Sequence, residues 1–161
     1  MGLFDKLFQS KEEGLYAPVK GEVVALSQVS DPTFGQGILG KGIAVIPQDD
    51  MICAPCNGTV DMVFDTKHAV TLRGESGVEI LIHVGLDTVQ LAGEHFTAHV
   101  KAGDVVRAGQ LLITADLQAL KDKGYDIITP MVICNTDEFK EVISYENKGV
   151  TKSHVVIGLV K

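Results

Sequence analysis

A predicted β-hairpin over residues 65–85 constrains the fold of this chain more than any other stretch. Two runs rich in β-branched and apolar residues flank a cluster of turn formers, Gly74-Glu75-Ser76-Gly77, and this pattern is typical of two antiparallel strands. A turn centred in the middle of that cluster would place His68 directly opposite His83. Opposed side chains share one face and lie about 4.5–5.5 Å apart at Cβ, so the two imidazoles are expected to form one site. The pairing depends on the register, because a shift by one residue would send the two rings to opposite faces.

The remainder of the chain repeats a pattern of short strands separated by glycine, asparagine and aspartate. Strands are predicted at residues 21–26, 42–47, 58–64, 68–73, 78–84, 95–100, 110–115, 130–134 and 155–160. Helices are predicted only at 116–123 and 137–144, each beginning with an aspartate that can cap it. This spacing predicts an all-β fold, a compact antiparallel β-sandwich or barrel with one or two short helices. One domain is expected to span residues 15–161.

Residues 1–14 are predicted to form a flexible N-terminal tail. Its first part places Leu3, Phe4, Leu7 and Phe8 on one stripe of a helix that is too short to be stable alone in water. Such a segment suits weak contact with a lipid surface through residues 1–10. A frayed end, or a segment packed onto the domain, is the alternative. The polar residues 10–14 are interpreted as a tether.

Charge and cysteine content narrow the class of protein. The net charge of −7 argues against a nucleic-acid partner held by phosphate contacts. Cys53, Cys56 and Cys134 form an odd set in a chain without a recognisable secretory signal, which predicts a reducing compartment. No apolar run approaches the roughly 20 residues that span a bilayer.

Four chemical roles are open to the predicted histidine pair. A zinc hydrolase needs three protein ligands and one open position; Asp87 could bend back towards His83, but no H-E-x-x-H or H-x-H motif supplies a further ligand. A nucleophilic triad would need a serine in a nucleophile elbow, which the sequence lacks. The pair could also be purely structural. The fourth role is phosphoryl transfer through histidine itself.

Phosphoryl transfer matches the neighbouring residues. A neutral imidazole nitrogen can attack phosphorus when the other ring nitrogen keeps its proton, and the Gly85 carbonyl could hold that proton on His83. His68 could donate to a phosphoryl oxygen, and Thr66 could orient the His68 ring. The nucleophile must remain open to a partner protein. An apolar docking rim with charges at its edge is therefore predicted around it, formed by Phe34, Phe64, Leu81 and Val89.

Seven short sequence blocks give the chain a family resemblance from Gly14 to Lys161. They comprise residues 17–21, 40–44, 54–60, 66–69, 82–89, 93–96 and 129–133, among which the run His83-Val84-Gly85-Leu86-Asp87-Thr88-Val89 is the most specific. These blocks resemble the glucose-type enzyme IIA of the bacterial phosphoenolpyruvate-dependent sugar phosphotransferase system. The first seven residues also look like the N-terminal tail of enteric members of that family.

The resemblance implies a cytoplasmic phosphocarrier with no organic cofactor and no metal needed for transfer. Phosphorylated HPr would pass its phosphoryl group to Nε2 of His83, and His83 would pass it to the cysteine of a IIB domain. His68 would steady the phosphoryl group, Thr66 would orient His68, and the Gly85 carbonyl would hold His83. Asp87 would lie near the rim and meet a basic residue of the partner. The alternative is a regulatory or zinc-binding interaction module that uses the same two histidines.

Overall fold

The computed structural model describes residues 12–161. The predicted amphipathic stripe falls on residues 1–11 and lies outside the described residues. The chain is built mainly from short strands, and every strand pair is antiparallel. This arrangement confirms the predicted all-β class.

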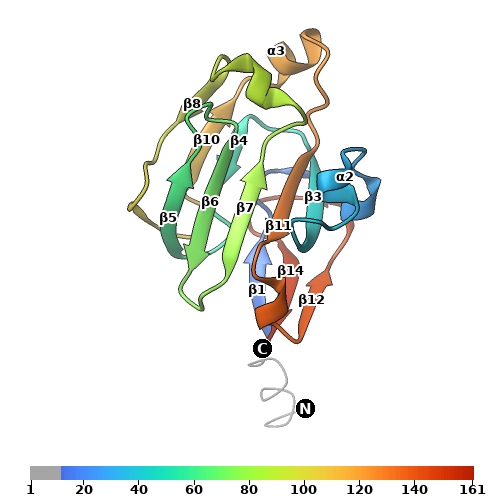
Figure 1. Cartoon of the computed structure of the whole chain (residues 1–161), viewed down its shortest axis with the longest axis vertical. Helices are drawn as coiled ribbons and strands as arrows, with labels where there is room; N and C mark the ends of the chain where they lie inside the picture. The colour runs from blue at the N-terminus through green and yellow to red at the C-terminus, as the bar shows by residue number, and fades with distance from the viewer. Residues whose placement is uncertain (1–11) are drawn as a thin grey trace.

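The elements follow one another along the chain with short connections (Figure 1). The strands are β1 (Glu12–Tyr16), β2 (Gly21–Ala25), β3 (Lys41–Pro47), β4 (Met51–Cys53), β5 (Gly58–Val63), β6 (Ala69–Gly74), β7 (Glu79–His83), β8 (Phe96–Ala98), β9 (Val105–Val106), β10 (Leu111–Ala115), β11 (Thr129–Ile133), β12 (Glu141–Ser144), β13 (Asn147–Val150) and β14 (Val155–Val160). The helices are α2 (Pro32–Gly35) and α3 (Leu117–Asp122), and the 3-10 turns are η1 (Leu26–Gln28), η2 (Thr88–Leu91) and η3 (Thr136–Glu138).

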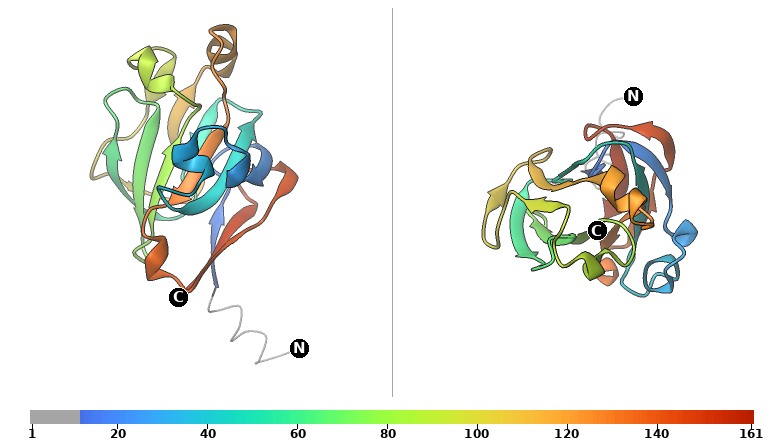
Figure 2. Two further views of the ribbon diagram at one scale, coloured as in Figure 1. Left: turned by 45° about the vertical axis from the view of Figure 1, so that its right-hand side comes forward. Right: turned by 90° about the horizontal axis from the view of Figure 1, so that it is seen from above.

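Three sheets enclose the core. The largest has eight strands in the order β13-β2-β3-β11-β7-β6-β5-β9, and two three-stranded sheets have the orders β4-β10-β8 and β1-β14-β12. Figure 2 shows these sheets curving around a common interior, with α3 and η2 at one end. The C-terminal strand β14 pairs with β1, so Val160 lies opposite Glu12 at the other end of the molecule. The strand β7, with β11 and β6 on either side, lies in the middle of the large sheet.

The large sheet is apolar on both faces. Along β7 the side chains alternate, so that Ile80 and Ile82 enter the main core while Leu81 points to the opposite face. On that outer face Leu81 belongs to a second buried cluster, which includes Phe34 of α2. The segment that contains η1 and α2 therefore covers part of the outer face (Figure 2). His83 is the last residue of β7 and lies on the same face as Leu81, next to Phe34 of the covering segment.

The predicted helix at residues 137–144 is wrong. The region contains η3 and then strand β12, which pairs with β14 over Glu141–Ser144. The β-branched pair Val142 and Ile143 favours extended backbone, and the free edge of β14 supplies the hydrogen bonds. In contrast, the helix predicted at 116–123 is confirmed as α3, and its Asp116 side chain accepts from the Ala119 N–H as the predicted cap.

Strand β1 includes residues that the sequence analysis assigned to the tail. Residues 12–14, which were assigned to the tail and its polar tether, are the first part of β1 and pair with Gly158–Val160 of β14. Four other strands, β4, β9, β12 and β13, also lie outside the predicted ones. They are between two and four residues long, too short for an alternating pattern to be recognised.

Candidate functional site

The hairpin β6–β7 forms as predicted, but its register differs by one residue. Ala69, not His68, lies opposite His83, and the Gly74 N–H donates to the Val78 carbonyl. The connection is a loop over residues 75–77 with Gly77 at φ 94°. A glycine with positive φ at the end of such a loop is typical of a three-residue hairpin connection. The turn is therefore centred on Ser76 and not, as predicted, between Glu75 and Ser76.

The two histidines nevertheless meet, because His68 does not belong to the strand. It lies in the β5–β6 loop, where Lys67 takes a left-handed conformation at φ 60° and the Val84 N–H donates to the His68 carbonyl at 2.7 Å. The ring centroids of His68 and His83 are 4.8 Å apart, with an angle of 83° between the ring planes. The loop conformation, rather than the strand pairing, brings the edge of one ring to the face of the other.

Aromatic side chains enclose the pair on two sides. The Phe34 ring lies 4.9 Å from the His83 ring, and the Phe64 ring packs edge-on against His68 at 5.5 Å. His68 is buried, with 2% of its surface exposed, whereas His83 is partly exposed. The outer ring of the pair is thus the one that a second protein can reach.

A hydrogen bond determines which ring nitrogen of His83 carries the proton. Its Nδ1 lies 2.7 Å from the Gly85 carbonyl oxygen. A carbonyl can only accept, so Nδ1–H is the donor, and in the neutral ring Nε2 carries the free lone pair. Nδ1 of His68 lies 2.6 Å from the Thr66 hydroxyl, a pair in which either group can donate.

Burial keeps both rings neutral. Desolvation, with a smaller contribution from His83, lowers the pKa of His68 from 6.5 to about 4. Desolvation also lowers the pKa of His83, although the hydrogen bond to Gly85 and the carboxylates of Asp31 and Asp87 act in the opposite direction. A neutral imidazole is the nucleophilic form, so at neutral pH His83 has the protonation state that nucleophilic attack requires.

The depressed pKa of His68 predicts a pH dependence of stability. Between pH 6.5 and about 4 the unfolded chain binds a proton at this residue that the folded chain does not bind. The stability present above pH 6.5 is therefore lost as the pH falls through this window, by on the order of 2–3 kcal/mol. Urea unfolding at pH 7.0 and 4.5 checks this, because a His68→Gln variant should lose less stability over the same interval than the wild type. Equal losses in both proteins would contradict it.

The turn after β7 requires glycine at position 85. Gly85 has φ 74°, and a Cβ there would lie 2.7 Å from Thr88 Cγ2 and 2.9 Å from the Asp126 carbonyl oxygen. We expect Gly85→Ala to lower the free energy of unfolding by about 2–4 kcal/mol, from left-handed strain and overpacking together. Gly124→Ala is the matched control, since Gly124 has φ 88° with nothing near its added Cβ. In denaturant titrations it should lose only about 1 kcal/mol, and an equal loss in both variants would remove the packing part of this explanation.

The residues of the predicted docking rim differ in their exposure. Phe34 and Leu81 are 4% and 9% exposed, so they form the floor of the site and offer a partner little surface. Phe64 is partly buried, and Asp87, at φ 60° directly before η2, is exposed. Val89 is 52% exposed, and its place in a docking rim stays a prediction.

Sequence reasoning missed two exposed apolar residues after α2. Ile38 is 68% exposed and Leu39 is 38% exposed, in the loop that follows the Phe34 helix. The signal available was their position between Gly37 and Gly40, both of which have positive φ. Adjacent large apolar residues in a short glycine-bounded loop have no strand or helix through which to reach the core.

The groups that could bind a metal ion can be examined within the described residues. Within residues 12–161, no three His, Cys, Asp or Glu side chains are grouped closely enough to hold a metal ion. The histidine pair alone provides two nitrogens, whereas zinc sites use three or four protein ligands.

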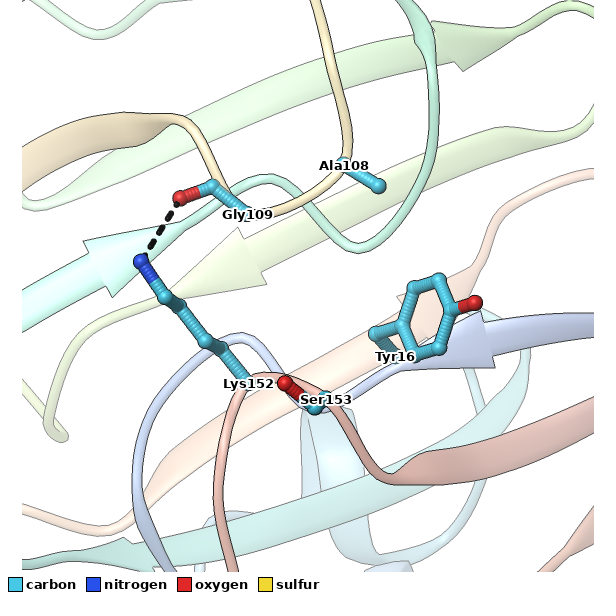
Figure 3. A pocket seen from close by; sticks show the side chains of 5 residues that line it. All are labelled: Tyr16, Ala108, Gly109, Lys152 and Ser153. Carbon is cyan, nitrogen blue, oxygen red and sulfur yellow. Dashed lines mark hydrogen bonds between the residues drawn. The ribbon is translucent and has the colours of Figure 1, made fainter.

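A cavity of about 400 Å³ lies away from the pair and is lined by Tyr16, Ala108, Gly109, Lys152 and Ser153 (Figure 3).

Comparison with known proteins identifies the family. Residues 13–139 match the family described as phosphoenolpyruvate-dependent sugar phosphotransferase system, EIIA 1. The chain belongs to this EIIA family. EIIA components are phosphotransferase relay proteins, and this EIIA chain is accordingly a phosphocarrier of the sugar phosphotransferase system.

Individual relatives agree with this assignment. The EIIA chain is 44% identical over 154 residues to the glucose-specific EIIA component of Oceanobacillus iheyensis, covering 92% of this chain and 93% of that protein. It is 47% identical over 131 residues to the β-glucoside-specific EIIBCA component of Bacillus subtilis, covering 81% of this chain but only 22% of that longer protein. The solved glucose permease IIA from Mycoplasma capricolum superimposes with a TM-score of 0.86 at 34% identity, covering 98% of this chain and 99% of that one.

Two expectations about the membrane have different outcomes. None of the helices formed by residues 12–161 has the length and apolar character to cross a bilayer. The predicted lipid contact of residues 1–10 falls outside the described residues and stays a prediction.

Proposed function

We propose that this EIIA chain accepts a phosphoryl group from phosphorylated HPr on Nε2 of His83 and passes it to the cysteine of a IIB domain. The observation that carries the proposal is the 2.7 Å contact between His83 Nδ1 and the Gly85 carbonyl on a neutral, partly exposed ring. That contact leaves the Nε2 lone pair as the only nucleophile on the ring. Such a relay operates in the cytoplasm, where the donor protein is phosphorylated.

No proton has to leave the site during either phosphoryl transfer step. The Nε2 lone pair of His83 forms a bond to phosphorus while the bond from phosphorus to the donor's imidazole nitrogen breaks, and that imidazole leaves with the electron pair. His83 keeps its Nδ1 proton on the Gly85 carbonyl throughout. In the second step the IIB thiolate attacks phosphorus, and the His83–phosphorus bond electrons return to Nε2.

His68 is suited to stabilise the charge on the phosphoryl oxygens. When its Nδ1 accepts from the Thr66 hydroxyl, its Nε2 carries the proton and becomes a donor next to His83. A donor held in a buried, water-poor place needs no reorganisation as charge develops on the transferring group. Thr66 thus contributes to transfer by fixing the orientation of the His68 ring.

The surface around His83 combines apolar contacts with acidic charge. Val89, two residues after Asp87, provides exposed apolar area, and Asp31 and Asp87 act electrostatically on the His83 ring. We propose that a partner docks an apolar patch with basic residues here, because interfaces of this kind have an apolar centre and a charged rim. The names of the longer relatives, EIIBCA components, place A, B and C parts in one protein, which supports a IIB domain as one such partner.

Phosphoryl labelling tests the proposal. The purified chain is incubated with labelled phosphoenolpyruvate, enzyme I and HPr, and label on the chain is followed with and without HPr. Labelling should require HPr, survive alkali and be lost in acid, as expected for phosphohistidine. No labelling in the complete mixture would overturn the proposal. Stoichiometric zinc binding by the unlabelled chain would instead favour the alternative, an interaction module built on the same histidine pair.

A further inference from the structure

The backbone turn that follows His83 is held from two sides. The Thr88 hydroxyl donates to the Val84 carbonyl at 2.6 Å, and the Leu86 N–H donates to the Asp126 carbonyl at 2.9 Å. Thr88 is fully buried. The carbonyl of Gly85, which accepts the His83 proton, belongs to the same peptide unit as the Leu86 N–H. The orientation of that acceptor is therefore fixed by groups that do not touch the imidazole.

Packing adds to these hydrogen bonds. The Thr88 methyl group and the Asp126 carbonyl oxygen occupy the space where a Cβ on Gly85 would lie. The Asp126 side chain accepts from the Ile128 N–H at 2.9 Å, which fixes the segment leading into β11. The turn thus rests on the neighbouring segment of the large sheet.

We infer that Thr88 is a positioning residue for phosphoryl transfer, which acts by holding the Gly85 carbonyl on Nδ1 of His83. This inference rests on the proposed function for its effect on rate, but its effect on the imidazole proton can be measured without any transfer. A loosened turn would let the His83 proton move between Nδ1 and Nε2. In the Nε2–H tautomer the attacking lone pair is lost.

Two substitutions separate the hydroxyl of Thr88 from its shape. Thr88→Val keeps the volume but removes the donor to the buried Val84 carbonyl, whereas Thr88→Ser keeps the donor and removes the methyl group. Long-range ¹⁵N–¹H spectra of the imidazole rings should show one Nδ1–H tautomer for His83 in the wild type and in Thr88→Ser. Thr88→Val should show a mixture, and its labelling rate from phosphorylated HPr should fall about tenfold.

A matched variant shows what a loss of stability does when the turn after His83 is left intact. Thr136 is a partly buried threonine in η3, and its hydroxyl donates to the Ile133 carbonyl at 2.6 Å, at the end of β7 away from His83. Thr136→Val should lower the urea midpoint as Thr88→Val does, but leave the His83 tautomer unchanged. The inference is overturned if Thr88→Val keeps the wild-type tautomer and rate, or if Thr88→Ser shows the same loss as Thr88→Val. If the wild type takes no label at all, the proposed function fails, and the spectra of the unphosphorylated proteins still decide the role of Thr88.

Discussion

Replacing His83 with Gln is expected to abolish phosphoryl labelling of the chain. Glutamine can still donate its side-chain amide to the Gly85 carbonyl, but the amide nitrogen has no lone pair available for attack on phosphorus. The labelling rate should fall by at least about a thousandfold, because no other group replaces a missing nucleophile. The partly exposed position of His83 predicts only a small change in stability.

A second histidine variant provides the control for this result. His99 is exposed, and its Nε2 contacts the Thr114 hydroxyl at 2.7 Å, away from the His68–His83 pair. His99→Gln makes the same chemical change and should leave the labelling rate unaltered. Label that persists on His83→Gln at the wild-type rate would show that a different residue is phosphorylated.

Replacing His68 with Gln is expected to separate the two transfer steps. The variant keeps the His83 nucleophile and its hydrogen bond to Gly85, so it should still accept the phosphoryl group. Transfer onward to a IIB domain should slow by about a hundredfold, the usual effect of removing one preorganised donor from a developing negative charge. The reason is that the amide of Gln cannot reproduce both the Thr66 contact and the edge-on approach to the His83 ring.

Single-turnover measurements distinguish the steps. The phosphorylated variant is isolated, mixed with a IIB domain, and the loss of label from His83 is timed against the wild type. Thr66→Val, which removes the hydroxyl that orients His68, should show an intermediate defect in the second step. Slowing of acceptance and donation by the same factor in His68→Gln would contradict the assignment of His68 to the second step.

The class of fold and the meeting of the two histidines could be predicted from sequence, for different reasons. Alternating apolar residues and turn formers define strands reliably, and the predicted strands at 42–47 and 155–160 lie almost where β3 and β14 are found. The histidine contact was inferred from a register that was wrong by one residue. It exists because His68 leaves the strand in a loop with Lys67 at positive φ, which no local pattern indicates.

The exposure of the proposed rim residues was harder to predict, because burial on the outer face depends on a distant segment. Leu81 lies on the face of β7 away from the main core, where an apolar residue suggests an exposed contact. The segment containing η1 and α2 folds over that face and brings Phe34 with it. The loop beyond α2, with Ile38 and Leu39, remains exposed. The covering segment and β7 are far apart in the sequence, so neither stretch alone indicates that one buries the other.

The placement of His83 at the end of a central strand has a kinetic consequence. The backbone of His83 is anchored in an eight-stranded sheet, and its ring is held by Gly85. His83 therefore cannot move from one partner protein to another as the flexible arm of a carrier domain does. In the proposed relay, donor and acceptor must therefore bind the same small area in turn. Each excludes the other while bound, so the exchange follows ping-pong kinetics, and an excess of the unphosphorylated donor slows delivery to the acceptor by competition.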